Sequence, residues 1–410
     1  MQNRIFLLIT LFVCSTFIST LHCQNTQRKS EHVILISFDG FRWDYPERGL
    51  TPNMQKLRER GVSATGLKAV FPTKTFPNHI SIVTGLYPEN HGIILNDFIN
   101  PFTGADYALG NRAAVRNGNW YDCEFIWETA QKQGVKSASY FWPASSIVQE
   151  GRHPERFEVY DHDRPFETRV IGVLNWLSLP KNERPQFITM YFHLSDSYGH
   201  DYGPESPKVN FAIARQDSML GLLMDGLAQK NLLDKTDIIV VSDHGMIETF
   251  KEKSIRIEED LLSAEECRFT SDGPIMMVQP KVGDTDRIYK ILKNNETHFR
   301  AYLRAEVPEH LHFSNHPFIS DIVLIAEPGW TLLHGASGDW LPGKGNHGYS
   351  PHLINMHGIF YAAGPSFRRN FRTGTLQTID LYPLLCAILN IYPVQNIDGK
   401  FERIGYILER

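Results

Sequence analysis

The sequence predicts an α/β protein with a mostly parallel central sheet, helices on both faces of that sheet, and a smaller inserted subdomain. Two observations lead to this fold class. Continuous apolar runs stop abruptly at turn residues, which is typical of strands buried on both faces of a parallel sheet. These runs alternate with segments of helical periodicity from residue 32 to residue 245, the pattern of a doubly wound sheet.

The predicted strands are rich in apolar and β-branched residues, and the predicted helices carry apolar residues at helical spacing. Thr51 and Pro52 mark the start of the first helix, and a second one begins at Thr75. The strands are predicted at 32–38, 90–97, 137–143, 186–192, 237–242 and 357–364, and the further helices at 125–132, 167–179, 213–227 and 378–390. From about 251 to 345 the alternation degrades into short strands, prolines and charged residues, which indicates the inserted subdomain.

The N-terminus is predicted to be an export signal that takes no part in the fold. Arg4 precedes an apolar run over residues 5–13, and a polar segment follows, so we interpret residues 1–23 as a signal peptide and residues 24–410 as one mature domain. An uncleaved membrane anchor is disfavoured because the apolar run is short for a bilayer span. We expect an exported protein, periplasmic or secreted, without a membrane span in the mature chain; lipidation of Cys23 stays open.

Composition excludes some functions. The 410 residues carry a net charge of −5, and the basic residues are scattered, so no stable nucleic-acid partner is expected. The three cysteines beyond the signal, Cys123, Cys267 and Cys386, are too few and too widely spaced for a disulfide framework, which favours a bacterial periplasm over an animal cell surface. Asn295 begins a glycosylation sequon with meaning only in a eukaryote. The oligomeric state is open, with a monomer favoured.

Acidic residues and histidines follow three of the predicted strands. Asp39 follows the first strand, Asp196 and His200 lie in a loop after another, and Asp243 and His244 follow a third. A single aspartate after a strand is usually a turn or helix cap, but three such sites, two with histidines, exceed what capping requires. Ligands of open α/β sheets bind beyond the carboxyl ends of strands, and carboxylate plus imidazole suits zinc or a similar ion.

Two further residues complete the predicted chemistry. His347 lies between glycines that let the backbone approach closely; alone it would be interpreted as a surface-loop histidine, but the set above lacks one ligand. Thr75 lies where a new helix begins, and the unpaired N–H groups there favour an anion. Taken alone, Thr75 would be interpreted as a helix cap. The predicted metal site makes it the candidate nucleophile instead.

These motifs resemble the nucleotide pyrophosphatase/phosphodiesterase family of the alkaline phosphatase superfamily, in its single-domain bacterial form. The resemblance covers residues 31–395 and implies an alkaline-phosphatase-like sheet within a phosphodiesterase catalytic domain at 24–410. It rests on the segments 38–42, 73–79, 87–93, 196–203, 242–246 and 346–349.

The resemblance implies two Zn²⁺ ions. One would be held by Asp196, His200 and His347, and the other by Asp39, Asp243, His244 and the hydroxyl of Thr75. Asn96 matches the residue that steadies phosphate oxygens together with the Thr75 backbone N–H. The mechanism we expect is attack by Thr75 on phosphorus, which forms a phospho-threonine ester that water then hydrolyses.

Phe76 and Tyr202 match positions where nucleotide-using relatives sandwich the base, and Trp142 is a further candidate for lining the pocket. Packing of these rings in the core is the alternative. Ser146 stands where relatives carry an acidic or polar residue, so the base preference is open. The expected substrates are nucleoside triphosphates, dinucleotides and phosphodiesters, cleaved to nucleoside 5′-monophosphates. The alternatives are a choline or lipid phosphodiesterase on the same scaffold and, less favoured, a non-catalytic metal-stabilised binding protein.

Overall fold

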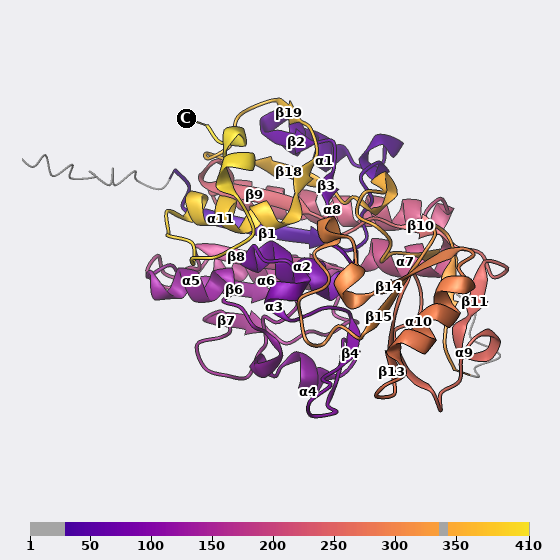
Figure 1. The fold of residues 1–410 in the computed structure, drawn as a ribbon. Coiled ribbons are helices and arrows are strands. Elements are labelled where there is room, and N and C mark those ends of the chain that lie inside the picture. The colour runs from indigo at the N-terminus through magenta and orange to yellow at the C-terminus, as the bar shows by residue number, and fades with distance from the viewer. Residues whose placement is uncertain (1–28, 336–342, 410) are drawn as a thin grey trace, which may run out of the picture.

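The structure is a computed structural model that describes residues 29–335 and 343–409. The predicted signal peptide, with Cys14 and Cys23, lies outside the described residues. An eight-stranded sheet runs through the centre of the molecule (Figure 1). Its strands, in spatial order, are β19 (Phe371–Thr373), β2 (Val62–Ala64), β18 (Phe360–Ala363), β9 (Thr236–Val241), β1 (His32–Phe38), β8 (Phe187–Phe192), β6 (Ser137–Tyr140) and β7 (Arg156–Glu158).

The strand directions confirm a mostly parallel sheet. β1 pairs in parallel with both β8 and β9, and β6 pairs in parallel with β8 and β7. β18 is the exception, because it pairs antiparallel with both β9 and β2. The carboxyl ends of β1, β8 and β9 therefore meet at one edge of the sheet.

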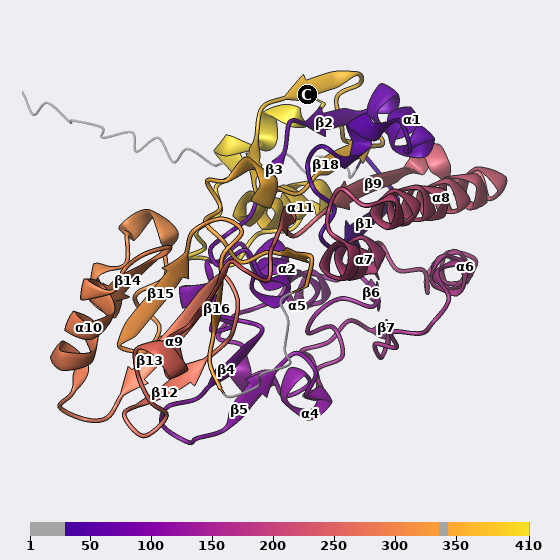
Figure 2. The ribbon, with the colours of Figure 1, turned by 90° about the vertical axis from the view of Figure 1, so that its right-hand side faces the viewer.

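Helices cover both faces of this sheet. They are α1 (Pro52–Arg60), α2 (Thr75–Thr84), α3 (Pro88–His91), α4 (Arg112–Val115), α5 (Ile126–Lys132), α6 (Phe166–Trp176), α7 (Leu194–Tyr202), α8 (Pro207–Gln229) and α11 (Leu381–Leu389). Figure 2 shows α6, α7 and α8 on one side of the sheet, and α2, α5 and α11 on the other. The buried apolar residues beneath these helices accordingly form two cores, one on each face of the sheet.

The apolar run of β1 explains why it lies in the middle of the sheet. Every residue of the strand is buried, and successive side chains point to opposite faces. Val33 and Leu35 pack into the core beneath α2, α5 and α11, whereas Ile34 and Ile36 pack into the core beneath α1, α6 and α8.

A second, antiparallel sheet lies beside the first, on the right in Figure 1, and has its own apolar core. Its order is β12 (Cys267–Thr270), β13 (Ile275–Pro280), β15 (Ile322–Ala326) and β14 (Phe299–Leu303), packed on α9 (Ile257–Asp260) and α10 (Thr285–Asn294). These elements fall inside the predicted subdomain at 251–345. The remaining strands form two-stranded pairs: β3 (Leu67–Lys68) with β20 (Leu376–Gln377), β4 (Asp97–Ile99) with β5 (Asp106–Ala108), β10 (Ile247–Glu248) with β17 (Gly345–Asn346), and β11 (Ser254–Arg256) with β16 (Thr331–Leu333).

Two local expectations were wrong. The segment 90–97 is not a strand: Pro88 begins the short helix α3, Gly92 ends it with a φ of 87°, and a strand begins only at Asp97. Proline suits the first turn of a helix, and glycine readily adopts the left-handed conformation that ends one. The segment with Asp196 and His200 is not a loop but part of α7. The two side chains therefore lie one turn apart on one face.

No helix in residues 29–335 and 343–409 combines the length and apolar character that a bilayer span requires. The three cysteines beyond the predicted signal, Cys123, Cys267 and Cys386, are thiols in the structure.

Leu35→Ala should destabilise the protein strongly, because Leu35 is fully buried in the central strand. We expect the free energy of unfolding to fall by about 2–5 kcal/mol, the range for truncating a buried leucine. Ile171→Ala on α6, where the side chain is half exposed, is the control and should change stability by no more than about 0.5 kcal/mol. Equal losses in denaturant unfolding would contradict this placement of β1.

Candidate metal centre and active site

The carboxyl ends of three neighbouring strands deliver the predicted ligands to one place. Asp39 directly follows β1, α7 follows β8 and carries Asp196 and His200, and Asp243 and His244 follow β9. His347 arrives from β17, which pairs with β10 just after that third segment. Parallel pairing of β1 with β8 and β9 thus explains why residues about 200 positions apart converge.

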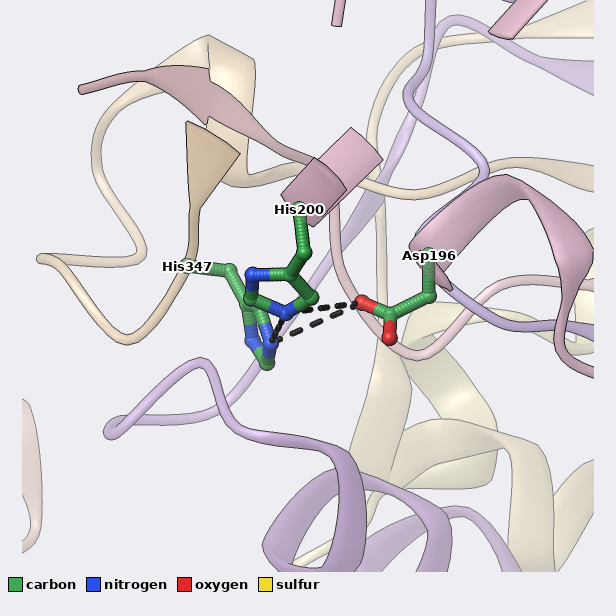
Figure 3. Close-up of side chains that lie close together, drawn as sticks. All are labelled: Asp196, His200 and His347. Atoms are coloured by element: carbon green, nitrogen blue, oxygen red, sulfur yellow. Dashed lines mark hydrogen bonds and ion pairs between the residues drawn. The ribbon is translucent and has the colours of Figure 1, made fainter. Parts of the chain in front are cut away.

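The first group consists of Asp196, His200 and His347, whose side chains point toward one another (Figure 3). The Asp196 Oδ1 lies 3.4 Å from the His200 Nε2 and 3.6 Å from the His347 Nε2. The two Nε2 atoms lie 3.1 Å apart. One ligand atom from each residue falls within 4.8 Å of the others, close enough to share one metal ion.

The second group lies next to the first and contains Asp39, Asp243 and His244. The His244 Nε2 lies 3.0 Å from the Asp243 Oδ2 and 3.4 Å from the Asp39 Oδ1. The ring of His244 stacks on the ring of His347, with centroids 3.5 Å apart, so the two groups are in direct contact. Asp39, Asp196 and His244 also fall within 4.8 Å of one another.

The three imidazoles are held in one tautomer by the backbone. The Nδ1 atoms of His200, His244 and His347 lie 2.7–2.9 Å from the carbonyl oxygens of Gly345, Gly245 and Thr73. A carbonyl only accepts, so each Nδ1 carries the proton and each Nε2 presents a lone pair to the site. Lone pairs of His200 and His347 that face each other at 3.1 Å repel unless a cation lies between them.

The carboxylates fit a cation for the same reason. Among the described residues, the Asp39 Oδ1, the Asp196 Oδ1 and the Asp243 Oδ2 are buried without a hydrogen-bond donor. Burial, with Asp243 and Asp196 close by, holds the pKa of Asp39 well above its usual range. Three carboxylates and three imidazole lone pairs around one small volume form a donor set of the kind that binds divalent metal ions.

Thr75 begins α2 beside the second group. Its Oγ1 lies 3.3 Å from the His244 Nε2. The Asn96 Oδ1 accepts the N–H of Phe76 at 2.9 Å, which turns the Asn96 amide toward the start of this helix. The Thr75 N–H, at the first position of α2, has no intrahelical acceptor. The hydroxyl, this N–H and the Asn96 amide together can surround an anion.

Thr73, two residues earlier, ties α2 to the segment after the second sheet. Its carbonyl accepts the His347 Nδ1–H, and its hydroxyl accepts the N–H of Gly348 at 2.8 Å and donates to the carbonyl of Tyr349 at 3.0 Å. The nucleophile candidate and a ligand candidate are therefore positioned by the same residue.

The predicted aromatic residues differ in their surroundings. Phe76 is half-buried and contacts the ring edge of Tyr107, whereas Tyr202 is 41% exposed and packs on Tyr198. Trp142 is buried; its indole N–H lies 3.2 Å from the carbonyl of His79, so it supports α2 from behind. Their roles in substrate binding stay predictions.

Sequence reasoning missed His79 and Tyr191. The His79 Nδ1 lies 2.8 Å from the Thr75 carbonyl and 3.3 Å from the Asp243 Oδ2, and its Nε2 accepts the hydroxyl of Ser37. Tyr191 donates its hydroxyl to the Asp39 Oδ2 at 2.5 Å. His79 stands four residues after Thr75, one helical turn, which was the available signal. Tyr191 is one of two residues with a hydroxyl in an otherwise apolar strand, the other being Thr189.

Tyr160 was missed as well. It is 39% exposed, and its ring centroid lies 5.9 Å from that of Tyr191. Burial and the charge of Asp39 raise the pKa of Tyr160 to about 12, against the opposing effect of the Arg169 cation. It therefore offers an open aromatic face near the carboxylates. Nothing in its local sequence distinguishes it from a surface tyrosine.

Residues 33–350 match the family described as type I phosphodiesterase / nucleotide pyrophosphatase. The chain belongs to this family, whose named members are hydrolases. It is 37% identical to human ectonucleotide pyrophosphatase/phosphodiesterase family member 1 over 92% of this chain and 42% of that protein. It is 34% identical to human member 5 over 98% of this chain and 83% of that protein, and 36% identical to a venom phosphodiesterase of Naja atra over 92% and 46%.

The solved structure of murine member 5, an inactive variant in complex with AMP, matches with a TM-score of 0.87 and 33% identity, over 92% of this chain and 100% of that one. The predicted family and fold class are confirmed. The chain spans about half the length of several relatives, 42% of human member 1 and 44% of bovine member 3. These relatives are animal proteins, so the bacterial form of the resemblance stays a prediction.

Asp196→Asn should lower the divalent metal bound per chain by roughly one ion, because the amide removes the carboxylate charge of the first group. Asp201→Asn, on the same helix but exposed, is the matched control and should keep the wild-type content. Metal analysis after dialysis gives the readout. Equal metal content in both variants would contradict the assignment.

Chelation should also lower the thermal midpoint of the wild type, since three buried carboxylates lose their countercharge.

Proposed function

We propose that this protein is a zinc-dependent nucleotide pyrophosphatase/phosphodiesterase that releases nucleoside 5′-monophosphates through a phospho-threonine ester on Thr75. The observation that carries the proposal is the position of the Thr75 hydroxyl, 3.3 Å from the His244 Nε2, beside two groups of buried or partly buried carboxylates and imidazoles. A hydroxyl at neutral pH is a weak nucleophile, and this site offers what is needed to activate one.

Two zinc ions suit the donor set. Asp196, His200 and His347 would hold one, and Asp39, Asp243, His244 and the Thr75 hydroxyl would hold the other. When bound, such ions lower the pKa of a coordinated hydroxyl and neutralise charge on the oxygens around phosphorus. The absence of a cysteine from the set favours a catalytic over a structural zinc site.

The residues of the chain then divide the reaction between them. The Thr75 Oγ attacks phosphorus; the Oγ–P bond forms while the bond from phosphorus to the leaving oxygen breaks on the opposite side. The Thr75 N–H and the amide of Asn96 hold the non-bridging oxygens. Water then attacks the ester, the Oγ–P bond breaks, and the 5′-monophosphate leaves with Thr75 restored.

Positioning of the nucleophile depends on His79. Its Nδ1–H donates to the Thr75 carbonyl at 2.8 Å and lies 3.3 Å from the Asp243 Oδ2, so the same ring contacts the first turn of α2 and one ligand candidate. Trp142 packs edge-on against that ring with centroids 5.0 Å apart.

A nucleotide substrate is favoured over a choline or lipid ester. Phe76 directly follows the nucleophile and is half open, and stacking of a base on an aromatic ring contributes about 1–3 kcal/mol. The related murine structure contains AMP, which supports the same substrate class here. We further propose that the protein is exported, as the names of its ectonucleotidase and venom relatives support, and acts as a monomer.

The substrate class is tested with three chromogenic esters and the zinc-loaded protein. Nitrophenyl-TMP should be cleaved with a far higher kcat/KM than nitrophenyl phosphate or nitrophenyl-phosphocholine, and ATP should yield AMP. Preference for the choline ester would overturn the nucleotide assignment. Failure to cleave any of the four would support a binding protein instead.

Thr75→Ala should retain bound metal yet lose turnover of nitrophenyl-TMP by roughly a thousandfold or more, because no other hydroxyl occupies this position. Thr65→Ala, at an exposed threonine in the turn after β2, should retain wild-type turnover. Trapping of a phosphorylated Thr75 by acid quench and peptide mass spectrometry gives an independent readout. Substantial residual activity in Thr75→Ala would require another nucleophile.

A further inference from the structure

A buried lysine next to the nucleophile has no assigned role. Lys74 precedes α2 in an extended conformation and is only 8% exposed. Among the described residues, no hydrogen-bond acceptor or ion-pair partner contacts its Nζ. Its ammonium is removed from water without a compensating partner among these residues, which is unfavourable.

The position of the Lys74 side chain is set by the segment that carries His347. A Cβ atom on Gly348 would lie 2.6 Å from the Lys74 Cε and 3.3 Å from its Nζ, so glycine leaves the space that the lysine chain occupies. A Cβ on Gly273, from the second sheet, would lie 3.8 Å from the Nζ and 3.2 Å from the Asn346 Nδ2. The ammonium therefore lies where α2, the His347 segment and the second sheet meet.

The glycine against which Lys74 packs places it on one side of the site. Gly348 directly follows His347, so the Lys74 side chain lies beside the Asp196, His200 and His347 group. Thr75, in contrast, faces His244 in the other group.

An in-line displacement puts the leaving group opposite the nucleophile. With Thr75 beside His244, the leaving oxygen departs toward the Asp196, His200 and His347 group, which is the side of Lys74. Three carboxylates and a threonine alkoxide would balance the charge of two divalent ions, which leaves no positive charge for a multiply charged leaving group. Among the described residues, Lys74 has the buried ammonium that can supply it.

We propose that Lys74 binds the phosphate oxygens of a polyphosphate leaving group and so favours nucleoside triphosphates and dinucleoside polyphosphates over diesters with an uncharged leaving group. This inference rests on the proposed function and adds the determinant of its leaving-group specificity. An ammonium is suited to this task because its three donors rotate to meet oxygens of differing geometry.

The test is Lys74→Met, which removes the charge and keeps a chain of similar length beneath Gly348. Lys68→Met, on β3 and also partly buried, is the control for losing a lysine elsewhere. We expect Lys74→Met to lower kcat/KM for ATP and for a dinucleoside tetraphosphate by about 10- to 100-fold, the effect of losing a charged hydrogen bond. Turnover of nitrophenyl-TMP, whose leaving group carries no phosphate, should change less than about threefold, and Lys68→Met should match the wild type on all substrates.

A binding measurement separates this role from a general loss of activity. In the Thr75→Ala background, Lys74→Met should weaken calorimetric binding of pyrophosphate by about 10-fold or more and leave binding of AMP and the metal content unchanged. Equal losses on ATP and nitrophenyl-TMP, or no loss on either, would overturn the proposal for Lys74. If the wild-type protein cleaved no nucleotide at all, the proposed function itself would fail, which is a different outcome.

Discussion

Mutual repulsion inside the site is the constraint on which the rest of the structure depends. Asp39, Asp196 and Asp243 present buried oxygens to one small volume, and three histidines are fixed so that their lone pairs face the same volume. Such an arrangement is unfavourable without positive charge. The parallel pairing of β1 with β8 and β9 holds it in place, and both apolar cores are needed to keep that pairing rigid.

The two sheets contribute different residues to this site. The central sheet supplies Asp39, Asp196, His200, Asp243 and His244 from the ends of its strands. The segment that returns from the second sheet supplies His347 and the glycine beside Lys74. Most of the candidate ligands thus come from the central sheet, and the segment from the second sheet completes the set.

Much of the fold and of the candidate site could be predicted from the sequence, for a physical reason. A strand buried on both faces must be apolar throughout, so β1, β8 and β9 are visible as runs, and an acid that ends such a run is conspicuous. Helix α7 was mistaken for a loop because Gly199, Ser195 and Ser197 are weak helix formers; its helical state depends on packing against α8, which no local pattern encodes.

His79 and Tyr160 carry little local indication that they lie at the site. His79 looks like any histidine in a helix until its contact with Asp243 is known, and that contact joins residues 164 positions apart. Tyr160 looks like a surface aromatic, because its proximity to Tyr191 depends on how the loop after β7 folds back. Side chains that act through other side chains leave little trace in a linear pattern.

The hydrogen bonds of Thr73 have a consequence for motion. One residue connects α2 to the His347 segment through its carbonyl and its hydroxyl, so a hinge movement of the second sheet cannot leave the start of α2 behind. Movement of the His347 segment would therefore carry Thr75 with it, and local unfolding at this junction would disturb the nucleophile candidate and a ligand candidate together.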